Sequence, residues 1–433
     1  MSMDQIKIDI EDLTTGMYVS RLDRPWIETP FPLQGYYIKE LSDISALRQY
    51  CKHVYIDIRR GKSPVDPVFL QTLDSSFSNG ITNKSVKGVK SRKLKTKKGF
   101  YKYATSPRKE VKNAHKMKEL AELAISYIDG ALASHKKFPV KETKKVVSLM
   151  VQNIIKNPDA FIWLNKIKDK DSHLYGHTVR TTIWAISLGR HLGVSVDALN
   201  NLALGIMISE VGKTKLPDSL LEKSQADFSL EELELYQTHV MHAMEILNET
   251  DGMNNHVLGV VASMHEKHDG SGYPQGLIGD QIPYLAKLAG ISGYYDEITF
   301  PRNEEFGLSP TDGIAQIYRM INQEFQKDLV EEFIQATGIY PAGTLVELST
   351  SETAMVIEQN PERRLRPKVL LLLDAEKNRY KRFKLLDLMK KVKTVDGRYL
   401  EIAYSLPIGS YGADPSSIYD TAFTSKWSFS KAS

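Results

Sequence analysis

The order of apolar and polar residues predicts a small folded module at the start of the chain. Residues 6–10 alternate between apolar and polar, and residues 13–20 supply a turn followed by a strand. Residues 41–50 have the pattern of a short helix, and 53–58 that of a closing strand. We therefore expect a small β or α/β module over residues 1–65.

The spacing of the apolar residues changes in the middle of the chain. Apolar residues recur at spacings of three and four from 113 to 338, as in helices with one buried face. Segments containing Gly, Pro or Asp, such as 157–159 and 251–252, separate the repeats. This pattern predicts an all-α domain over residues 113–338.

Strand-like runs follow the helical part. Residues 344–348, 354–358 and 369–373 are short, apolar and rich in β-branched or leucine side chains. They predict a small β appendage over 339–411. The last segment, 412–433, is rich in Ser, Ala and Asp, and we expect it to be poorly ordered.

Residues 66–112 have no apolar period and are dominated by Ser, Gly, Asn and Lys. Such a composition predicts a basic, flexible and solvated linker. Contact with nucleic acid or an anionic membrane is a less favoured alternative, because the aromatic residues cluster at only one end. These residues are Phe100, Tyr101 and Tyr103.

Composition adds few constraints. The chain has 433 residues, 42% of them hydrophobic and 25% charged, which is ordinary for a globular protein. Its net charge of +4 is too small to indicate nucleic acid as a partner. Cys51 is the only cysteine, so an intrachain disulfide is excluded. No run reaches the roughly 18 apolar residues that span a bilayer, and the N-terminus lacks signal-peptide features. We expect a cytoplasmic protein.

The stretch 265–277 carries the most specific signal. Three glycines and a proline specify a fixed, non-helical loop after a helical segment that ends in histidine. We expect Tyr273 to project from this loop, which is a common way to build a site for a planar or phosphorylated ligand.

Several separated blocks occur in a recognisable order. His177 opens His-Thr-Val-Arg, residues 205–218 form a hydrophobic run followed by Ser-Glu-Val-Gly-Lys, and His239 follows. The Gly-Tyr-Pro loop and the block 290–299 complete the series. Over roughly 115–310 the chain resembles the HD-GYP family, metal-dependent phosphohydrolases that cleave the bacterial messenger cyclic di-GMP. Its N-terminal module resembles a small domain of unknown function that often precedes them.

The resemblance implies a metal centre. Two metals activate a water and stabilise the leaving oxyanion in phosphodiester hydrolysis, and a neighbouring lysine neutralises phosphate charge. Such metals, here Fe, Mn or Zn, are held by histidines and a bridging aspartate in the family. The matching candidates in this chain are His173, His177, His239, His265 and Glu210 as ligands, with Lys213 as the lysine.

Three departures indicate that this centre is degenerate. Ser209-Glu210 replaces the His-Asp pair, Met264 replaces the first of two adjacent histidines, and Gly293 replaces a metal-binding aspartate. A serine is a poor substitute for an imidazole, and Glu210 is one methylene longer than aspartate. We expect no stable two-metal centre, and either no metal or one weakly held divalent ion.

Nucleotide recognition is the second implication. Tyr273, flanked by Gly272 and Pro274, can stack on a guanine, while Lys213 and Arg302 can pair with phosphate. Next to Arg302, Asn303-Glu304 replaces the family's Pro-Tyr and brings an acid near an anionic ligand.

Some of these residues have simpler explanations. Without the resemblance, His173 and His177 are more readily ordinary helix histidines. A phosphate-binding role and an ordinary helix-end cation are equal alternatives for Lys213. Glu210 is either a metal ligand or the partner of Lys213. We predict that His242 is structural or exposed, that His268 faces solvent, and that Met264 packs in the core.

The preferred hypothesis is a bacterial cyclic di-GMP signalling protein without effective phosphodiesterase activity. It would act through nucleotide binding or through contacts of the Gly-Tyr-Pro loop with diguanylate cyclase (GGDEF) domains. The first alternative is an active phosphodiesterase with a metal site rebuilt from Glu210, His173 and the retained histidines. The second is an interaction protein with no nucleotide role.

Overall fold

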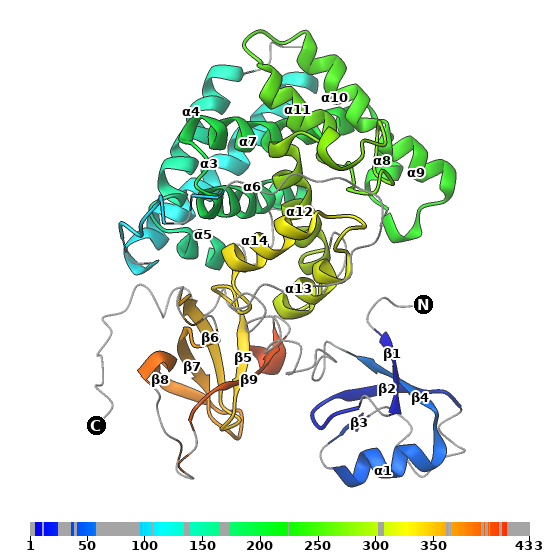
Figure 1. Ribbon diagram of the computed structural model, residues 1–433, viewed down its shortest axis with the longest axis vertical. Coiled ribbons are helices and arrows are strands. Elements are labelled where there is room, and N and C mark those ends of the chain that lie inside the picture. Colours follow the sequence, from blue (N-terminus) through cyan, green and yellow to red (C-terminus); the bar gives the residue numbers. More distant parts are fainter. Residues whose placement is uncertain are drawn as a thin grey trace. The chain divides into compact units, whose positions relative to one another are not determined.

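The protein is multidomain, as the sequence predicts, with an N-terminal module, a helical domain and a C-terminal sheet (Figure 1). It divides into two compact units: residues 1–81, 306–313 and 342–433, and residues 82–305 and 314–341. Each unit is described by itself. The computed structural model describes residues 5–10, 13–24, 36–38, 41–57, 96–97, 99–105, 107–133, 139–164, 173–223, 225–301, 307–360, 363, 365–390, 394, 397, 399–406 and 409–413.

The N-terminal module is an antiparallel sheet with one helix, in the strand order β1-β4-β2-β3. Its elements are β1 (Gln5–Asp9), β2 (Tyr18–Leu22), β3 (Tyr36–Tyr37), α1 (Leu41–Tyr50) and β4 (His53–Asp57). The alternation in β1 pairs Ile6 with Ile56 and Ile8 with Val54. The core beneath the sheet includes Met17, Val19, Ile38, Leu47, Val54 and Ile56.

The helical domain surrounds the candidate site. Its helices are α3 (Pro107–Ala133), α4 (Val140–Ile154), α5 (Pro158–Leu164), α6 (His173–Leu192), α7 (Val196–Ile208), η3 (Ser209–Lys215), α8 (Asp218–Leu221), η4 (Gln225–Asp227), α9 (Leu230–Gln237), α10 (His239–Asn248), α11 (Asn255–Ser263), η5 (Gly279–Gln281), α12 (Tyr284–Thr299), α13 (Pro310–Arg319) and α14 (Lys327–Thr337). Large side chains are fully buried among them, including Trp163, Trp184, Tyr295 and Phe333. Of the described helices, none combines the length and apolarity needed to cross a bilayer.

The 3-10 helix η3 and helix α10, which carry two of the site residues, are in close backbone contact. A Cβ on Gly212 would overlap the carbonyl oxygen of His239 and lie 2.5 Å from the amide nitrogen of Ala243. Glycine at 212 therefore lets η3 lie directly against α10. Helix α9 is set by a capping box, in which Ser229 and Glu232 bond each other's backbone amides at 2.7 and 3.1 Å.

The prediction of a flexible linker is wrong for the described residues at its C-terminal end. The Lys97 amide donates to Leu192 at 2.9 Å, and the Tyr101 hydroxyl donates to Val194 at 2.7 Å. Residues 107–112 belong to α3. Backbone and hydroxyl hydrogen bonds, which leave no apolar period in the sequence, hold this stretch on the helical domain. Residues 66–95 lie outside the described part of the chain.

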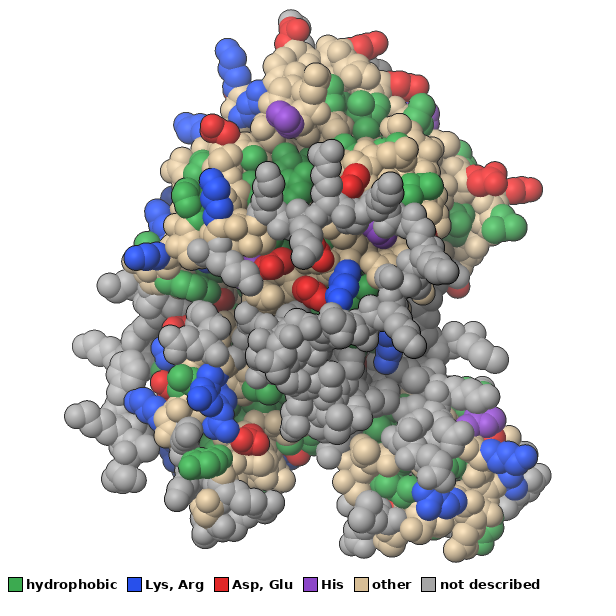
Figure 2. All heavy atoms as spheres, viewed as in Figure 1, with side chains coloured by type: hydrophobic (Ala, Val, Ile, Leu, Met, Phe, Trp, Pro, Cys, Tyr) green, Lys and Arg blue, Asp and Glu red, His purple; other side chains and the backbone are tan. Residues whose placement is uncertain are grey.

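The C-terminal sheet is antiparallel, with the order β8-β7-β6-β5-β9. Its strands are β5 (Leu345–Leu348), β6 (Thr353–Glu358), β7 (Lys368–Leu373), β8 (Arg379–Asp387) and β9 (Ile402–Leu406), and the short helices η6 (Leu388–Lys390) and η7 (Ser410–Gly412) follow β8 and β9. The sequence indicated only the first three strands. Figure 2 shows Lys and Arg side chains gathered on this sheet, and the exposed cations of edge strand β8 oppose pairing with another chain. They include Arg379, Lys381 and Lys384. The predicted tail from 414 onward lies outside the described residues.

Candidate metal centre

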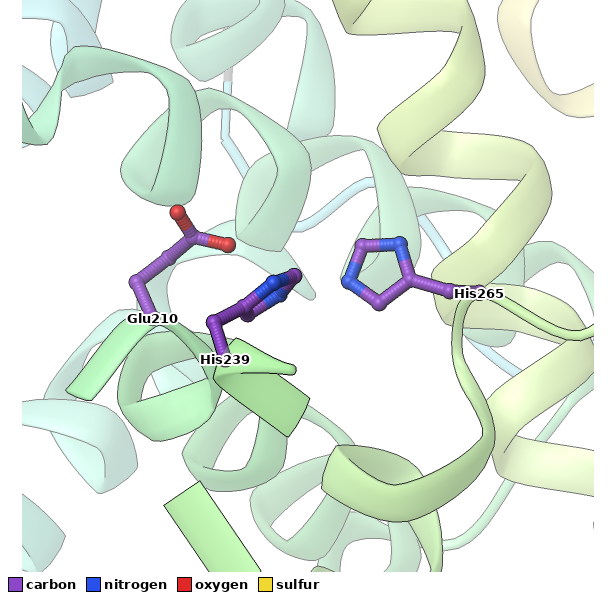
Figure 3. A group of neighbouring side chains, drawn as sticks. All are labelled: Glu210, His239 and His265. Atoms are coloured by element: carbon purple, nitrogen blue, oxygen red, sulfur yellow. The ribbon is translucent and has the colours of Figure 1, made fainter. Parts of the chain in front are cut away.

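Three of the candidate ligands lie together. Glu210 comes from η3, His239 is the first residue of α10, and His265 follows the end of α11. One ligand atom from each lies within 4.8 Å of the others. Figure 3 shows the three side chains converging on a common space. Two imidazoles and a carboxylate are a donor set that suits zinc and related divalent metals.

Local hydrogen bonds orient the histidines. The carboxamide of Asn254 accepts from the amides of His256 and Val257 at 3.0 Å, which fixes the start of the helix leading to His265. His239 Nδ1 lies 2.7 Å from the carbonyl oxygen of Tyr236. Because a carbonyl only accepts, Nδ1 of His239 must be the donor. Its Nε2 then carries the lone pair when the ring is neutral.

Each of the two histidines has a buried ring nitrogen without a hydrogen-bond partner among the described residues. These atoms are Nε2 of His239 and Nε2 of His265. A buried acceptor left without a partner costs about 1–3 kcal/mol, and a bound ion would remove that penalty at both atoms. Burial lowers the pKa of His265 to about 3 and also lowers the pKa of His239. Both rings are therefore neutral near pH 7, the state that binds metal. These residues fit one divalent ion.

Glu210 has a second partner besides the histidines. Its carboxylate forms an ion pair with Lys213, whose Nζ lies 5.0 Å from the ring centre of Tyr236. Burial opposes ionisation of Glu210, but attraction to Lys213, His239 and His177 outweighs it and holds the pKa of Glu210 well below its usual range. Glu210 is thus both a potential ligand and the partner of Lys213, two roles between which the sequence left a choice.

The three departures from the family pattern supply no ligand here. The Ser209 hydroxyl donates to the carbonyl of Ile206 at 2.8 Å. Met264 is buried, so its predicted place in the core is confirmed. A Cβ on Gly293 would lie 3.6 Å from Thr181 Cγ2 and 3.9 Å from the Met264 methyl, which are ordinary contacts. Space for a side chain exists at position 293, but none is present.

His177 is not part of the described three-residue cluster. Its Nδ1 lies 2.8 Å from a carboxylate oxygen of Asp296, which also binds Arg180. Sequence reasoning assigned Asp296 no role, although it falls in the block 290–299. His173 opens α6, and its side chain lies outside the described residues, as does all of Arg302.

Tyr273 is half-buried, and its side chain extends from the loop toward the metal centre. Its ring stacks on His265 with centroids 4.9 Å apart and an interplanar angle of 5°. Burial is the largest influence on the Tyr273 hydroxyl and raises its pKa. One face of the phenol is therefore engaged by a candidate metal ligand.

The loop is fastened by a buried acid. The Glu266 carboxylate accepts from the amides of Gln275 and Leu277 at 2.8 and 2.9 Å. A Cβ on Gly272 would lie 2.5 Å from the carbonyl oxygen of His265, so glycine is required for this path. The loop is consequently a fixed surface attached to the metal centre.

Two other histidines lie away from the centre. His268 is only 3% exposed, so the prediction that it faces solvent is wrong; its backbone amide donates to Glu324 and its carbonyl accepts from Gly279. His268 lines a small cavity together with Ile282, Phe325 and Leu329, and these apolar neighbours account for its burial. His242 is half-buried, with Nδ1 3.3 Å from Glu245, in line with a structural role.

Three parts of the chain match models of known protein families. Residues 163–329 match the model of the HD domain. This part of the chain is therefore similar to the HD domain. Residues 5–143 match a domain of unknown function, DUF3391, beyond the predicted module end at 65, and 345–395 match a KOW domain associated with HD domains.

Curated relatives of this chain carry phosphodiesterase names. Cyclic di-GMP phosphodiesterase PA4108 of Pseudomonas aeruginosa is 25% identical over 371 residues, 85% of each chain. Cyclic di-GMP phosphodiesterase PdeB of Borreliella burgdorferi is 23% identical and matches 43% of this chain and 49% of its own. The 3'3'-cGAMP-specific phosphodiesterase 2 of Vibrio cholerae is 26% identical over 40% of this chain and 33% of its own. Among solved structures, Bd1817 of Bdellovibrio bacteriovorus, an HDG"Y"P protein, is 16% identical with a TM-score of 0.43, covering 76% of this chain and 98% of its own.

Proposed function

We propose that this protein is a cytoplasmic cyclic di-GMP signalling protein with a degenerate HD-GYP site. It holds at most one divalent ion and hydrolyses cyclic di-GMP slowly or not at all. The observation that carries this proposal is the single described cluster of Glu210, His239 and His265. Among the described residues, Ser209, Met264 and Gly293 add no ligand beside it.

The chemistry of phosphodiester cleavage explains why one ion is insufficient. A two-metal site stabilises both the attacking and the leaving oxygen, and it lowers the pKa of the attacking water. One ion would supply only part of this stabilisation. Lys213 is already paired with Glu210, so its charge is partly neutralised before any phosphate arrives. Since each 1.4 kcal/mol changes a rate about tenfold, both losses favour a very slow reaction.

The Gly-Tyr-Pro loop supports a binding role that does not need catalysis. Glu266 fixes the loop backbone and His265 fixes one face of Tyr273. A surface ordered before binding loses little conformational entropy when a ligand arrives. Cyclic di-GMP is the proposed ligand, and a diguanylate cyclase domain is the proposed protein partner of the same loop.

Two assays on the purified protein test this function. We expect calorimetry to detect cyclic di-GMP binding that the Tyr273→Ala, Gln275→Ala double variant weakens at least tenfold, while the melting temperature changes little. Ser271→Ala, which removes only a hydroxyl bonded to Asp269, is the matched loop control. Unchanged binding in the double variant, or loss of its fold, would show that the loop is only structural.

The alternative is an active enzyme with a rebuilt site. Three protein ligands are the usual number at a catalytic zinc, which keeps its fourth position for water, and Glu210, His239 and His265 supply three. Metal-dependent turnover of cyclic di-GMP at about one per second or faster, abolished by Glu210→Ala, would establish this alternative in place of the proposal.

A further inference from the structure

We propose that Arg180 and Asp296 are positioning residues that hold the imidazole of His177 in one tautomer, with Nε2 as the free acceptor nitrogen near the metal centre. The inference rests on the proposed metal site and adds two residues to it. His177 and Arg180 lie on α6, and Asp296 lies on α12, so the arrangement joins two helices.

The carboxylate of Asp296 is completely buried and surrounded by donors. Its Oδ1 accepts from Arg180 Nε at 2.9 Å, and its Oδ2 accepts from Arg180 Nη2 at 3.0 Å. Nδ1 of His177 lies 2.8 Å from Oδ2. The two bonds between Arg180 and Asp296 have the fork geometry in which a guanidinium binds a carboxylate in a defined orientation.

The donors decide the tautomer of His177. A buried aspartate facing a guanidinium stays ionised, and an ionised carboxylate only accepts hydrogen bonds. Nδ1 of His177 must therefore carry the proton that it shares with Asp296. In the neutral ring, Nε2 then keeps its lone pair. Histidines that bind metals commonly donate their second nitrogen to a carboxylate in this way.

Arg180 is itself fixed in place. Its Cζ lies 4.9 Å from the ring centre of Phe300, within the range of a cation–π contact. A Cβ on Gly176 would lie 2.7 Å from Nη1 of Arg180, so glycine at 176 leaves the space that the guanidinium occupies. Without Arg180, Asp296 would be a buried charge compensated only by a histidine, which is strongly unfavourable.

His177 also interacts electrostatically with two residues of the metal centre. An interaction with His177 is among the smaller causes of the lowered pKa of both Glu210 and His265, which indicates that His177 lies near the cluster. The His177 side chain is 39% exposed, while Asp296 is 0% exposed. His177 is thus a partly exposed group that a buried acid holds through Nδ1.

Two measurements on the full chain test the inference. Nitrogen-15 spectra of histidine-labelled, metal-free protein report the His177 tautomer, and competition with a Zn²⁺ chelator reports metal affinity. In Asp296→Asn, we expect a mixture of His177 tautomers and a 10- to 100-fold weaker Zn²⁺ affinity, the usual effect of removing such a partner. The resonance of His242, which contacts Glu245 instead, serves as the internal reference and should not move.

A second variant tests the inference in case Asp296→Asn does not fold. Arg180→Lys keeps the positive charge but loses the two-point contact, and we expect the same tautomer mixing with an intact melting transition. An unchanged His177 tautomer with unchanged Zn²⁺ affinity in a folded variant overturns the inference. If the wild-type protein binds no Zn²⁺, the proposed metal centre fails, whereas the tautomer spectrum still decides the roles of Arg180 and Asp296.

Discussion

The ring of Tyr273 stacks on the imidazole of His265, with centroids 4.9 Å apart and planes 5° apart. The loop and the metal centre are therefore coupled through one ring contact. We expect Tyr273→Ala to weaken Zn²⁺ affinity about 2- to 10-fold, because an aromatic pair contributes about 0.5–1.5 kcal/mol. Tyr273→Phe keeps the stack and should retain affinity. Competition with a chelator measures both, and equal affinities in the two variants would show that the stack does not order His265.

Glu266 should control the mobility of the loop. Replacing it with Ala removes the acceptor for the Gln275 and Leu277 amides. Hydrogen bonds to a charged group contribute about 1.5–3 kcal/mol each, so we expect exchange at these two amides to accelerate more than tenfold. Amide exchange detected by mass spectrometry would measure this. Protection that persists in Glu266→Ala would mean that other contacts fix the loop; Glu324→Gln is a control outside these two bonds.

The close approach of η3 to α10 makes Gly212 intolerant of a side chain. In Gly212→Ala, the new Cβ would overlap the carbonyl oxygen of His239, and backbone must move to admit it. We expect the free energy of unfolding to fall by more than about 3 kcal/mol. Gly130→Ala is the matched control in α3, where a Cβ meets nothing within 4 Å. It should be neutral or stabilising by about 0.5–1 kcal/mol, and a similarly mild result at 212 would contradict the packing described.

The buried histidines predict a pH dependence for the metal-free protein. Burial lowers the pKa of His265 to about 3, below the value of about 6.5 expected in the unfolded chain. As the pH falls through 6.5, the unfolded chain gains a proton that the folded state does not. Stability should therefore decline from about pH 6.5 downward, by up to about 1.4 kcal/mol per pH unit for each such histidine.

Urea unfolding with a chelator present, between pH 7 and 4.5, measures this slope. His239 acts in the same direction, since burial also lowers its pKa. We expect His265→Gln to flatten the slope and His242→Gln to leave it unchanged. The same slope in His265→Gln and the wild type would show that His265 is not held neutral.

The three-part architecture could be predicted from the sequence, because the spacing of apolar residues and the composition both change at the domain boundaries. The sequence also named Glu210, His239 and His265, which the structure brings together. It could not give the partner of His177, because Asp296 lies 119 residues away and the contact depends on how α6 and α12 pack.

The failures have a common physical origin. Lys97, Tyr101 and Ala104 are held by backbone and hydroxyl hydrogen bonds, and such bonds leave no hydrophobic pattern. His268 is buried in a loop whose backbone bonds to Glu324 and Gly279, and it lines a small cavity with Ile282, Phe325 and Leu329. The stack of Tyr273 on His265 is set by the path of the loop and could not be read from the sequence. Each is a tertiary contact of a polar or amphipathic group.

Metal stoichiometry tests the central claim most directly. Elemental analysis of the purified protein, before and after loading with Zn²⁺, Mn²⁺ or Fe²⁺ and removal of free ions, counts the ions held per chain. With Glu210, His239 and His265 as the only described cluster of ligands, we expect no more than one ion, which the Glu210→Ala variant should lose. Two or more tightly held ions per wild-type chain would contradict the account.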